Sequence, residues 1–110
     1  STAVPKPKRT DMTFAEQVYA VLMQVPPGQV VTYGGLALLA GHPNAARAVG
    51  TLMARNPYGG LLPCHRVVSS TGRLSSREFR QEQACRLREE GVEVKDFTVD
   101  LKRYGWDGRR

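Results

Sequence analysis

The sequence predicts a mainly α fold, a small helical domain with a winged-helix-like helix-turn-helix and short strands. Two observations support this prediction. Apolar residues recur at helical spacing in several short segments that start with capping residues and stop at glycine or proline. Toward the C-terminus, apolar residues instead alternate over a few positions, a pattern typical of short strands. A chain of 110 residues is long enough for one domain with a single modest core.

The composition favours a protein that meets polyanions. The formal net charge is +6 and the sequence pI is about 9.8, a balance typical of nucleic-acid-binding domains. Basic residues near the two ends supply much of this charge, and the rest of the chain is near neutral to slightly basic. The charge alone therefore supports nucleic-acid binding only weakly.

The cysteines and the hydropathy predict the compartment. Cys64 and Cys85 could form at most one bridge, which is no disulfide framework. No apolar run approaches the roughly 18 residues that a membrane span needs, and no secretory signal opens the chain. We therefore expect a cytoplasmic protein (nucleoid-associated, or nuclear in a eukaryote) with Cys64 reduced and no membrane partner.

Prolines and basic side chains dominate residues 1–12, so we expect a disordered basic arm ahead of one domain over residues 13–110. Thr13 and Glu16 form a capping-box pattern at the start of a helix predicted over residues 13–25. Pro26-Pro27-Gly28 ends this helix. Its buried stripe repeats at helical spacing and consists of Phe14, Val18, Val21, Leu22 and Val25.

Two short helices joined by a tight turn are predicted next. The apolar pair at 30–31 is too short to be more than a link, and Thr32 is the expected N-cap of a helix that starts at Tyr33. After a break at 41–43, Asn44 is expected to cap a second helix that runs to about Arg55. The expected inward face of this second helix consists of Ala45, Ala48, Val49 and Leu52.

Such a pair is a helix-turn-helix, whose second helix commonly reads DNA. Ala45, Ala46 and Gly50 leave a helix surface that can approach a groove closely. Arg47 and Thr51, four residues apart, share the outer face, where Arg47 is the one long side chain. Helix pairs of this length and small residues also occur in packed helical cores, so spacing alone leaves both interpretations open.

The last third of the chain predicts one more helix and short strands. Ser75 and Glu78 form a second capping-box pattern, opening a helix that ends at Glu90 before Gly91. Its expected inward residues are Phe79, Ala84 and Leu87. Short strands are expected where Val92, Val94, Phe97, Val99 and Leu101 alternate, and the aromatic residues Tyr104 and Trp106 are expected to pack back onto the core.

The segment Pro63-Cys64-His65-Arg66-Val67 places a thiol beside an imidazole and a guanidinium. The thiolate is the attacking form of cysteine, and a neighbouring cation or base is expected to raise its share at neutral pH. For an isolated Cys-His pair, an ordinary core cysteine is the commoner interpretation. The two histidines and two cysteines do not have metal-ligand spacing, so we expect no metal site.

Four motifs taken together favour a reactive cysteine over an ordinary core cysteine. The residues Pro26-x-Gly-x-Val-x-Thr-Tyr-Gly, Ala46-Arg47-Ala48-Val49-Gly50, Asn56-Pro57 and Pro63-Cys64-His65-Arg66-Val67-Val68 occur in order between Thr13 and Gly91. In this register they resemble the DNA-binding and reaction domain of the O-6-alkylguanine-DNA alkyltransferases. The resemblance implies a protein that binds double-stranded DNA containing O-6-alkylguanine in the minor groove and needs no cofactor.

The resemblance also implies the chemistry. Cys64 matches the nucleophile that accepts the alkyl group in a single turnover, and His65 matches the base that draws off the thiol proton through a water. Glu90 matches the residue that orients this histidine, which completes a triad of nucleophile, base and orienter. Asn56 matches the asparagine that orders the turn beneath the active site.

On the DNA side, Arg47 matches the arginine finger that replaces the extruded guanine, and Tyr33 matches the tyrosine that drives the rotation of the base. A thiolate cannot reach a lesion inside a duplex, so the base must leave the stack. The remaining expected DNA contacts are Thr32, Ala45, Ala46, Gly50 and Thr51. The expected lining of the substrate pocket is Pro63, Arg66, Val67, Leu74 and Ser75.

Two departures from the family pattern leave two functions open. The chain lacks room for the additional N-terminal domain, and the segment 75–80 lacks the glycine- and tyrosine-containing loop that closes over the base. In both respects it resembles the alkyltransferase-like proteins, which bind alkylated guanine, commonly have tryptophan in place of the cysteine, and hand the lesion to nucleotide excision repair proteins. We therefore expect either a monomeric single-turnover alkyltransferase or a lesion sensor.

Overall fold

A computed structural model describes residues 12–55, 61–74 and 78–108. The predicted mainly α fold is confirmed. In chain order the elements are α1 (Phe14–Leu22), β1 (Val31–Thr32), α2 (Tyr33–Leu39), α3 (Ala46–Arg55), the 3-10 turn η3 (Cys64–Arg66), β2 (Val67–Val68), α4 (Arg80–Glu89) and α5 (Leu101–Tyr104). No helix in these three ranges is long and apolar enough to cross a membrane.

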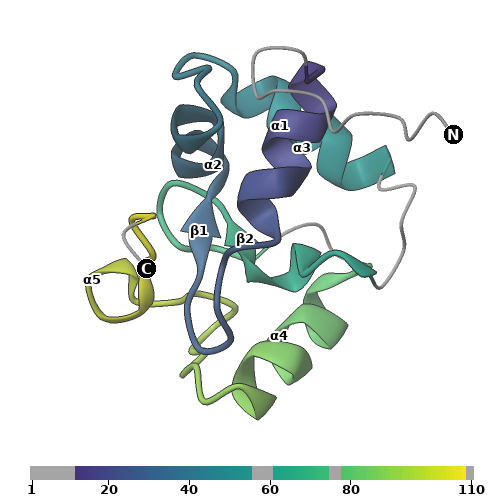
Figure 1. The fold of residues 1–110 in the computed structure, drawn as a ribbon. Coiled ribbons are helices and arrows are strands. Elements are labelled where there is room, and N and C mark those ends of the chain that lie inside the picture. The colour runs from purple at the N-terminus through teal and green to yellow at the C-terminus, as the bar shows by residue number, and fades with distance from the viewer. Residues whose placement is uncertain (1–11, 56–60, 75–77, 109–110) are drawn as a thin grey trace, which may run out of the picture.

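The two short strands form a parallel pair at the centre of the molecule. Val31 lies opposite Val67 and Thr32 opposite Val68, with α1 and α2 on one side of the pair and α4 on the other (Figure 1). The prediction that residues 30–31 form only a link is therefore wrong. The pairing joins segments far apart in the sequence, so no local pattern reveals it.

These strands separate two hydrophobic cores, because successive side chains of a strand point to opposite faces. Val31 and Val67 belong to the core between α1, α2 and α3. Val30 and Val68 belong to the core beneath α4. Trp106 is buried in the first of these cores, so the prediction that the C-terminal aromatic residues pack back onto the core is confirmed.

The first helix is shorter than predicted but starts as expected. Thr13 and Glu16 form both hydrogen bonds of a capping box. The helix ends at Leu22, not at Val25, because Val25 precedes a proline and such a residue avoids helical dihedral angles. Val25 is nevertheless buried in the core, as the apolar stripe predicts.

In the helix-turn-helix, the Thr32 side chain accepts a hydrogen bond from the Gly35 backbone N–H at 2.9 Å, so Thr32 is the N-cap of α2 as predicted. The start predicted for the second helix is wrong, because α3 begins at Ala46 and Asn44 lies in the preceding turn. The face of α3 that packs into the core is also narrower than predicted. Val49 is fully buried, whereas Ala48 is exposed to solvent.

The last predicted helix also starts later than the capping-box pattern indicates. Ser75 lies outside the described residues, Glu78 precedes the helix, and α4 begins at Arg80 without a side-chain cap. The predicted strands between 92 and 101 are wrong as well. In this described segment Thr98 forms isolated bridges to Arg73 and Lys95, and Leu101 starts α5. The alternation of apolar residues there arises because Val92, Val94 and Val99 face the second core.

The core between the first three helices makes a direct prediction about stability. Leu36 on α2 is 0% exposed, whereas Leu38 on the same helix is 59% exposed. We expect Leu36→Ala to lower the free energy of unfolding by about 2–5 kcal/mol through lost burial and a cavity. Leu38→Ala, its matched control, should change it by less than about 0.5 kcal/mol. Urea unfolding followed by circular dichroism measures both, and equal effects would contradict this packing.

Candidate active site and nucleic-acid interface

The reactive segment forms a tight turn next to the central strand pair. The Arg66 backbone N–H donates to the Pro63 carbonyl at 3.0 Å, and the Cys64 N–H donates to the Leu62 carbonyl at 2.8 Å. Val67 then continues into β2. The turn that carries Cys64 and His65 therefore leads directly into β2, and the pairing of β2 with β1 in the interior fixes its position.

Cys64 is half-buried and packs against the first core. Burial raises the pKa of the Cys64 thiol, because a low-polarity environment disfavours the thiolate. The expectation that neighbouring groups raise the thiolate share is therefore wrong for the resting structure. Arg66 does not supply that charge to the thiol, because its guanidinium is held by other groups.

Those groups are the carboxylate of Glu90 and a backbone carbonyl. Arg66 Nε donates to Glu90 Oε1 at 3.0 Å and Nη2 to Oε2 at 2.6 Å. Arg66 Nη1 donates to the Val25 carbonyl at 2.8 Å. Planar two-point pairing of this kind is the strongest arrangement of an arginine with a carboxylate. Arg66 thus ties the reactive turn to the end of α4 and to the segment after α1.

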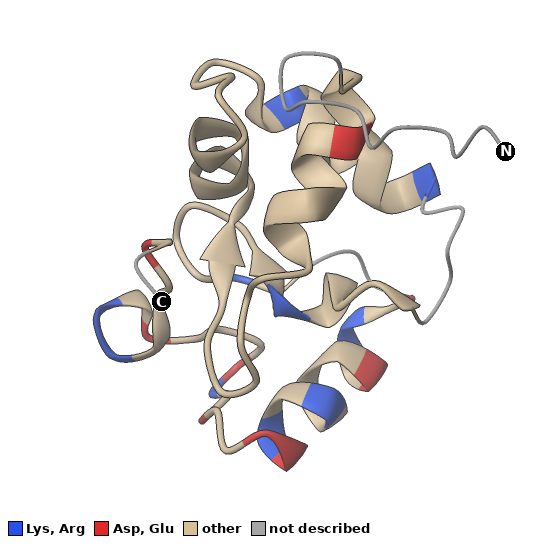
Figure 2. Ribbon diagram, viewed as in Figure 1, with Lys and Arg blue, Asp and Glu red and all other residues tan. Residues whose placement is uncertain are grey.

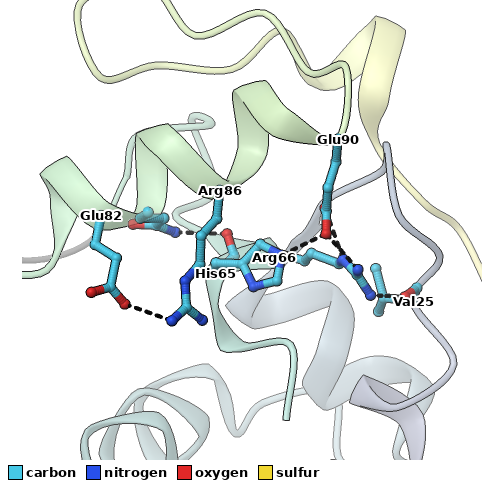
Figure 3. Close-up of polar contacts among 7 residues, drawn as sticks. Val25, His65, Arg66, Glu82, Arg86 and Glu90 are labelled. Atoms are coloured by element: carbon cyan, nitrogen blue, oxygen red, sulfur yellow. Dashed lines mark hydrogen bonds and ion pairs between the residues drawn. The ribbon is translucent and has the colours of Figure 1, made fainter. Parts of the chain in front are cut away.

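The same carboxylate holds the imidazole of His65. His65 Nε2 donates to Glu90 Oε2 at 2.9 Å, as Figure 3 shows beside the Arg66 contacts. Burial pushes the pKa of Glu90 upward, but the hydrogen bonds and charges of Arg66 and His65 outweigh it and lower that pKa to about 2. Glu90 therefore stays ionised at neutral pH and can act as the orienter predicted from the sequence.

The contact with Glu90 determines which nitrogen of a neutral His65 accepts a proton. A carboxylate can only accept, so Nε2 carries the hydrogen and Nδ1 has the lone pair. Nδ1 is buried and has no hydrogen-bond partner among the described residues. A buried acceptor in this position, one residue after a cysteine, is suited to take up a proton.

Glu90 occupies its position because α4 ends there. The Gly91 N–H donates to the Arg88 carbonyl and the Val92 N–H to the Leu87 carbonyl, the two bonds of a Schellman motif. Gly91 has φ +89°, which only glycine adopts readily. The Glu-Gly pair in the sequence is thus a helix end whose carboxylate contacts His65 and Arg66.

The residues expected to contact DNA lie on α2 and α3. Tyr33 is the first residue of α2, and Tyr33 and Cys64 both pack against the first core. Burial, followed by the charge of Cys64, raises the pKa of Tyr33. Arg47 and Thr51 are exposed on α3. A Cβ atom added at Gly50 would meet nothing within 4 Å in the described structure. Packing within the chain therefore does not require glycine at position 50.

The remaining predicted site residues lie around this centre. Thr32 caps α2, and the half-buried Ala45 and Ala46 lie at the start of α3. Pro63 is half-buried before the reactive turn, and Val67 and Leu74 are buried in the two cores. Asn56 and Ser75 lie outside the described residues. The assignment of Pro63, Arg66, Val67, Leu74 and Ser75 to a substrate pocket stays a prediction.

One polar residue of the site was not identified from the sequence. Gln83 on α4 is 0% exposed, and its side-chain amide donates to the backbone carbonyls of His65 and Val67. Its spacing from the buried Leu87 and from Glu90 places it on the inward face of the helix. A glutamine at a core position of a predicted helix is the signal that could have revealed it.

The charges are distributed unevenly over the elements. Figure 2 shows basic and acidic residues gathered along α4, whereas α2 carries neither.

Among the described residues, no group of three or more histidine, cysteine, aspartate or glutamate side chains could hold a metal ion.

The sequence of residues 13–92 matches the family model described as the 6-O-methylguanine DNA methyltransferase, DNA binding domain. The chain belongs to this family, which confirms the resemblance seen in the four motifs. The family comprises DNA repair alkyltransferases and alkyltransferase-like proteins that bind DNA.

Individual relatives represent both kinds of protein. The chain is 41% identical over 97 residues to the DNA base-flipping protein of Vibrio parahaemolyticus, covering 84% of this chain and 95% of the relative. It is 34% identical over 89 residues to the methylated-DNA–protein-cysteine methyltransferase of Methanosarcina acetivorans, covering 81% of this chain and 50% of the relative. It spans 30% of the bifunctional methyltransferase/endonuclease of Picrophilus torridus, with 41% identity over 88 residues and 79% of this chain covered.

The fold is similar to a solved complex. The crystal structure of S. pombe Atl1 with damaged DNA containing O6-carboxymethylguanine superposes with a TM-score of 0.78 and 37% identity, covering 84% of this chain and 94% of that chain. The helix-turn-helix domain described above is therefore the fold of a protein solved on damaged DNA.

The Glu90 contacts predict how acid affects stability. The pKa of Glu90 is about 2 in the folded chain against an ordinary value of 4.5, so its stabilisation is complete above pH 4.5 and is lost as pH falls toward 2. We expect Glu90→Gln to lower the free energy of unfolding at neutral pH by about 2–3 kcal/mol and to flatten its decline between those pH values. The exposed Glu89→Gln is the control. A Glu90→Gln profile that parallels the original chain at every pH would contradict this role.

Proposed function

We propose that the chain repairs O-6-alkylguanine in double-stranded DNA by transferring the alkyl group to Cys64. The observation that carries this proposal is the oriented His65–Glu90 pair, with the bond at 2.9 Å, directly beside a half-buried cysteine. A structural cysteine needs neither a buried histidine with a lone pair nor an ionised carboxylate to orient it. The geometry therefore favours nucleophilic chemistry at this turn.

The reaction consists of one displacement. His65 Nδ1 takes the thiol proton, through a water as the resemblance implies, and the sulfur attacks the alkyl carbon of the extruded base. The S–C bond forms while the bond between this carbon and O6 breaks, and the electron pair goes to the guanine. The guanine gains a proton from Tyr33, whose raised pKa keeps the phenol protonated. His65 returns its proton to Tyr33, so the products are alkylated Cys64 and guanine.

The described surface of α3 supports the DNA side of the proposal. Arg47 projects from a helix whose neighbouring positions are small or open, which suits insertion of this side chain into a minor groove. Tyr33 begins α2 and, like Cys64, packs against the first core. The similarity to a protein solved with damaged DNA supports the same partner.

A second candidate function is a lesion sensor that binds O-6-alkylguanine without reacting and recruits nucleotide excision repair proteins. Burial favours it, because the raised pKa of Cys64 leaves the thiol protonated at rest. The near-complete coverage of Atl1 and of the base-flipping relative also fits a domain that acts as a binding module. Under either function we propose a monomer that works in the cytoplasm at the nucleoid, or in the nucleus of a eukaryote. The predicted basic arm lies, except for Met12, outside the described residues.

Intact-mass spectrometry after incubation with a duplex containing O-6-methylguanine separates the two functions. We expect a gain of one methyl group per chain, because Cys64 is the acceptor. Cys64→Ser should abolish the gain and retain DNA binding, whereas Cys85→Ser, which changes an exposed thiol on α4, should leave the gain intact. Tight lesion-dependent binding without any mass change would reject the transferase and support the sensor.

Arg47 tests the DNA interface under both functions. We expect Arg47→Ala to weaken affinity for the lesion duplex by about tenfold or more, the range for an arginine that reads or fills a groove. Arg55→Ala removes the same charge from the exposed other end of α3 and should have a smaller effect. Fluorescence anisotropy at several salt concentrations measures both. Unchanged affinity for Arg47→Ala, or binding that does not weaken with salt, would reject the proposed duplex partner.

A further inference from the structure

Gln83 is the most deeply buried polar side chain near the reactive turn. It is 0% exposed, and its amide nitrogen Nε2 donates to the His65 carbonyl at 3.1 Å and to the Val67 carbonyl at 2.9 Å. A primary amide has two N–H donors, so both are used, one on each side of Arg66.

The two carbonyls belong to the backbone that carries the nucleophile. His65 lies in η3, the turn that begins at Cys64, and Val67 is the first residue of β2. A buried carbonyl without a donor is costly, so neither can leave Gln83 without a replacement. The turn cannot rotate or slide along α4 unless both hydrogen bonds break.

Glu90 lies two helical turns further along the same face of α4. It holds the side chains of His65 and Arg66, whereas Gln83 holds the backbone carbonyls on either side of Arg66. One rigid helix therefore controls both the ring of the base and the path of the chain that presents the thiol.

The same hydrogen bonds reach the DNA side of the site through the strand pair. Val67 lies opposite Val31, and the next residue of β1, Thr32, caps the helix that begins at Tyr33. Fixing Val67 therefore fixes the position of the Cys64 turn relative to Tyr33. A misplacement of about 1 Å between reacting groups can reduce a rate on the order of a hundredfold.

We propose that Gln83 is a positioning residue for alkyl transfer: its side-chain amide clamps the backbone of the Cys64–Arg66 turn so that the thiol meets the extruded base in line. The inference rests on the proposed transferase function. Gln83 is fully buried, and in this proposal it acts through the carbonyls of His65 and Val67.

Gln83→Met tests the clamp, because methionine has a similar length and removes both donors. We expect the rate of methyl transfer from an O-6-methylguanine duplex to fall at least tenfold. Affinity for the same duplex with Cys64→Ser as background should change less than threefold, because the residues proposed to meet DNA lie on α2 and α3, whereas Gln83 lies on α4. Gln81→Met changes an exposed glutamine of α4 and should react like the original chain.

A loss of stability alone is excluded by a second variant. Val92→Ala removes buried volume from the second core but keeps both amide donors. We expect it to retain the transfer rate at a temperature where both variants are folded. A Gln83→Met rate within twofold of the original chain, or a loss no larger than that of Val92→Ala, would overturn the proposal.

A readout without DNA separates failure of the clamp from failure of the transferase. Iodoacetamide labels Cys64 and the exposed Cys85, and peptide mass spectrometry gives the ratio of their rates. We expect Gln83→Met to raise the Cys64 to Cys85 ratio severalfold, because a released turn exposes the half-buried thiol. An unchanged ratio would overturn the clamp. If the original chain transfers no methyl group, the proposed function fails while this ratio still tests Gln83.

If Gln83→Met does not fold, the hydrogen bonds of Gln83 can be tested in the unsubstituted protein. In proton exchange measured by NMR, the side-chain amide of Gln83 should exchange at least tenfold more slowly than that of the exposed Gln81. Equal exchange rates would overturn the proposal.

Discussion

The parallel pairing of β1 with β2 is the constraint on which the rest of the structure depends. It consists of two residue pairs, Val31 with Val67 and Thr32 with Val68. Both faces of this short ribbon are covered, which is typical of parallel strands and explains the valine pairs in the sequence. Because α2 starts directly after β1 and β2 directly follows the turn with Cys64, the pairing brings the DNA-binding helices and the reactive turn together.

Around this ribbon, the site combines two ionisable groups whose pKa values shift in opposite directions. Arg66 and His65 keep the carboxylate of Glu90 ionised despite its burial, because hydrogen bonds and charge outweigh desolvation. Burial raises the pKa of Cys64, so its thiol stays protonated at neutral pH. The site therefore combines a protonated thiol with an imidazole that Glu90 orients, and under the proposed transferase function reactivity depends on His65 taking up the thiol proton.

The architecture also explains how one family can include methyltransferases and alkyltransferase-like proteins. The residues proposed to meet DNA lie on α2 and α3, whereas the groups proposed to orient the chemistry, His65 and Glu90, lie in η3 and at the end of α4. The two sets meet at the strand pair and in the first core, against which Cys64 packs. We expect lesion binding to persist when Glu90 or Gln83 changes, because α3 packs mainly on α2.

The sequence by itself determined the family, the capped start of α1, the N-cap at Thr32 and the pairing of His65 with Glu90, because each depends on local spacing or on motifs in register. The role of Cys64 as the nucleophile stays a prediction. Only the tertiary structure decided the strand pair, the start of α4 and the loss of the strands predicted near the C-terminus. It also decided the raised pKa of Cys64 and the hydrogen bonds that Gln83 donates to the reactive turn. These depend on burial and on contacts between segments far apart in the chain, which no local pattern encodes.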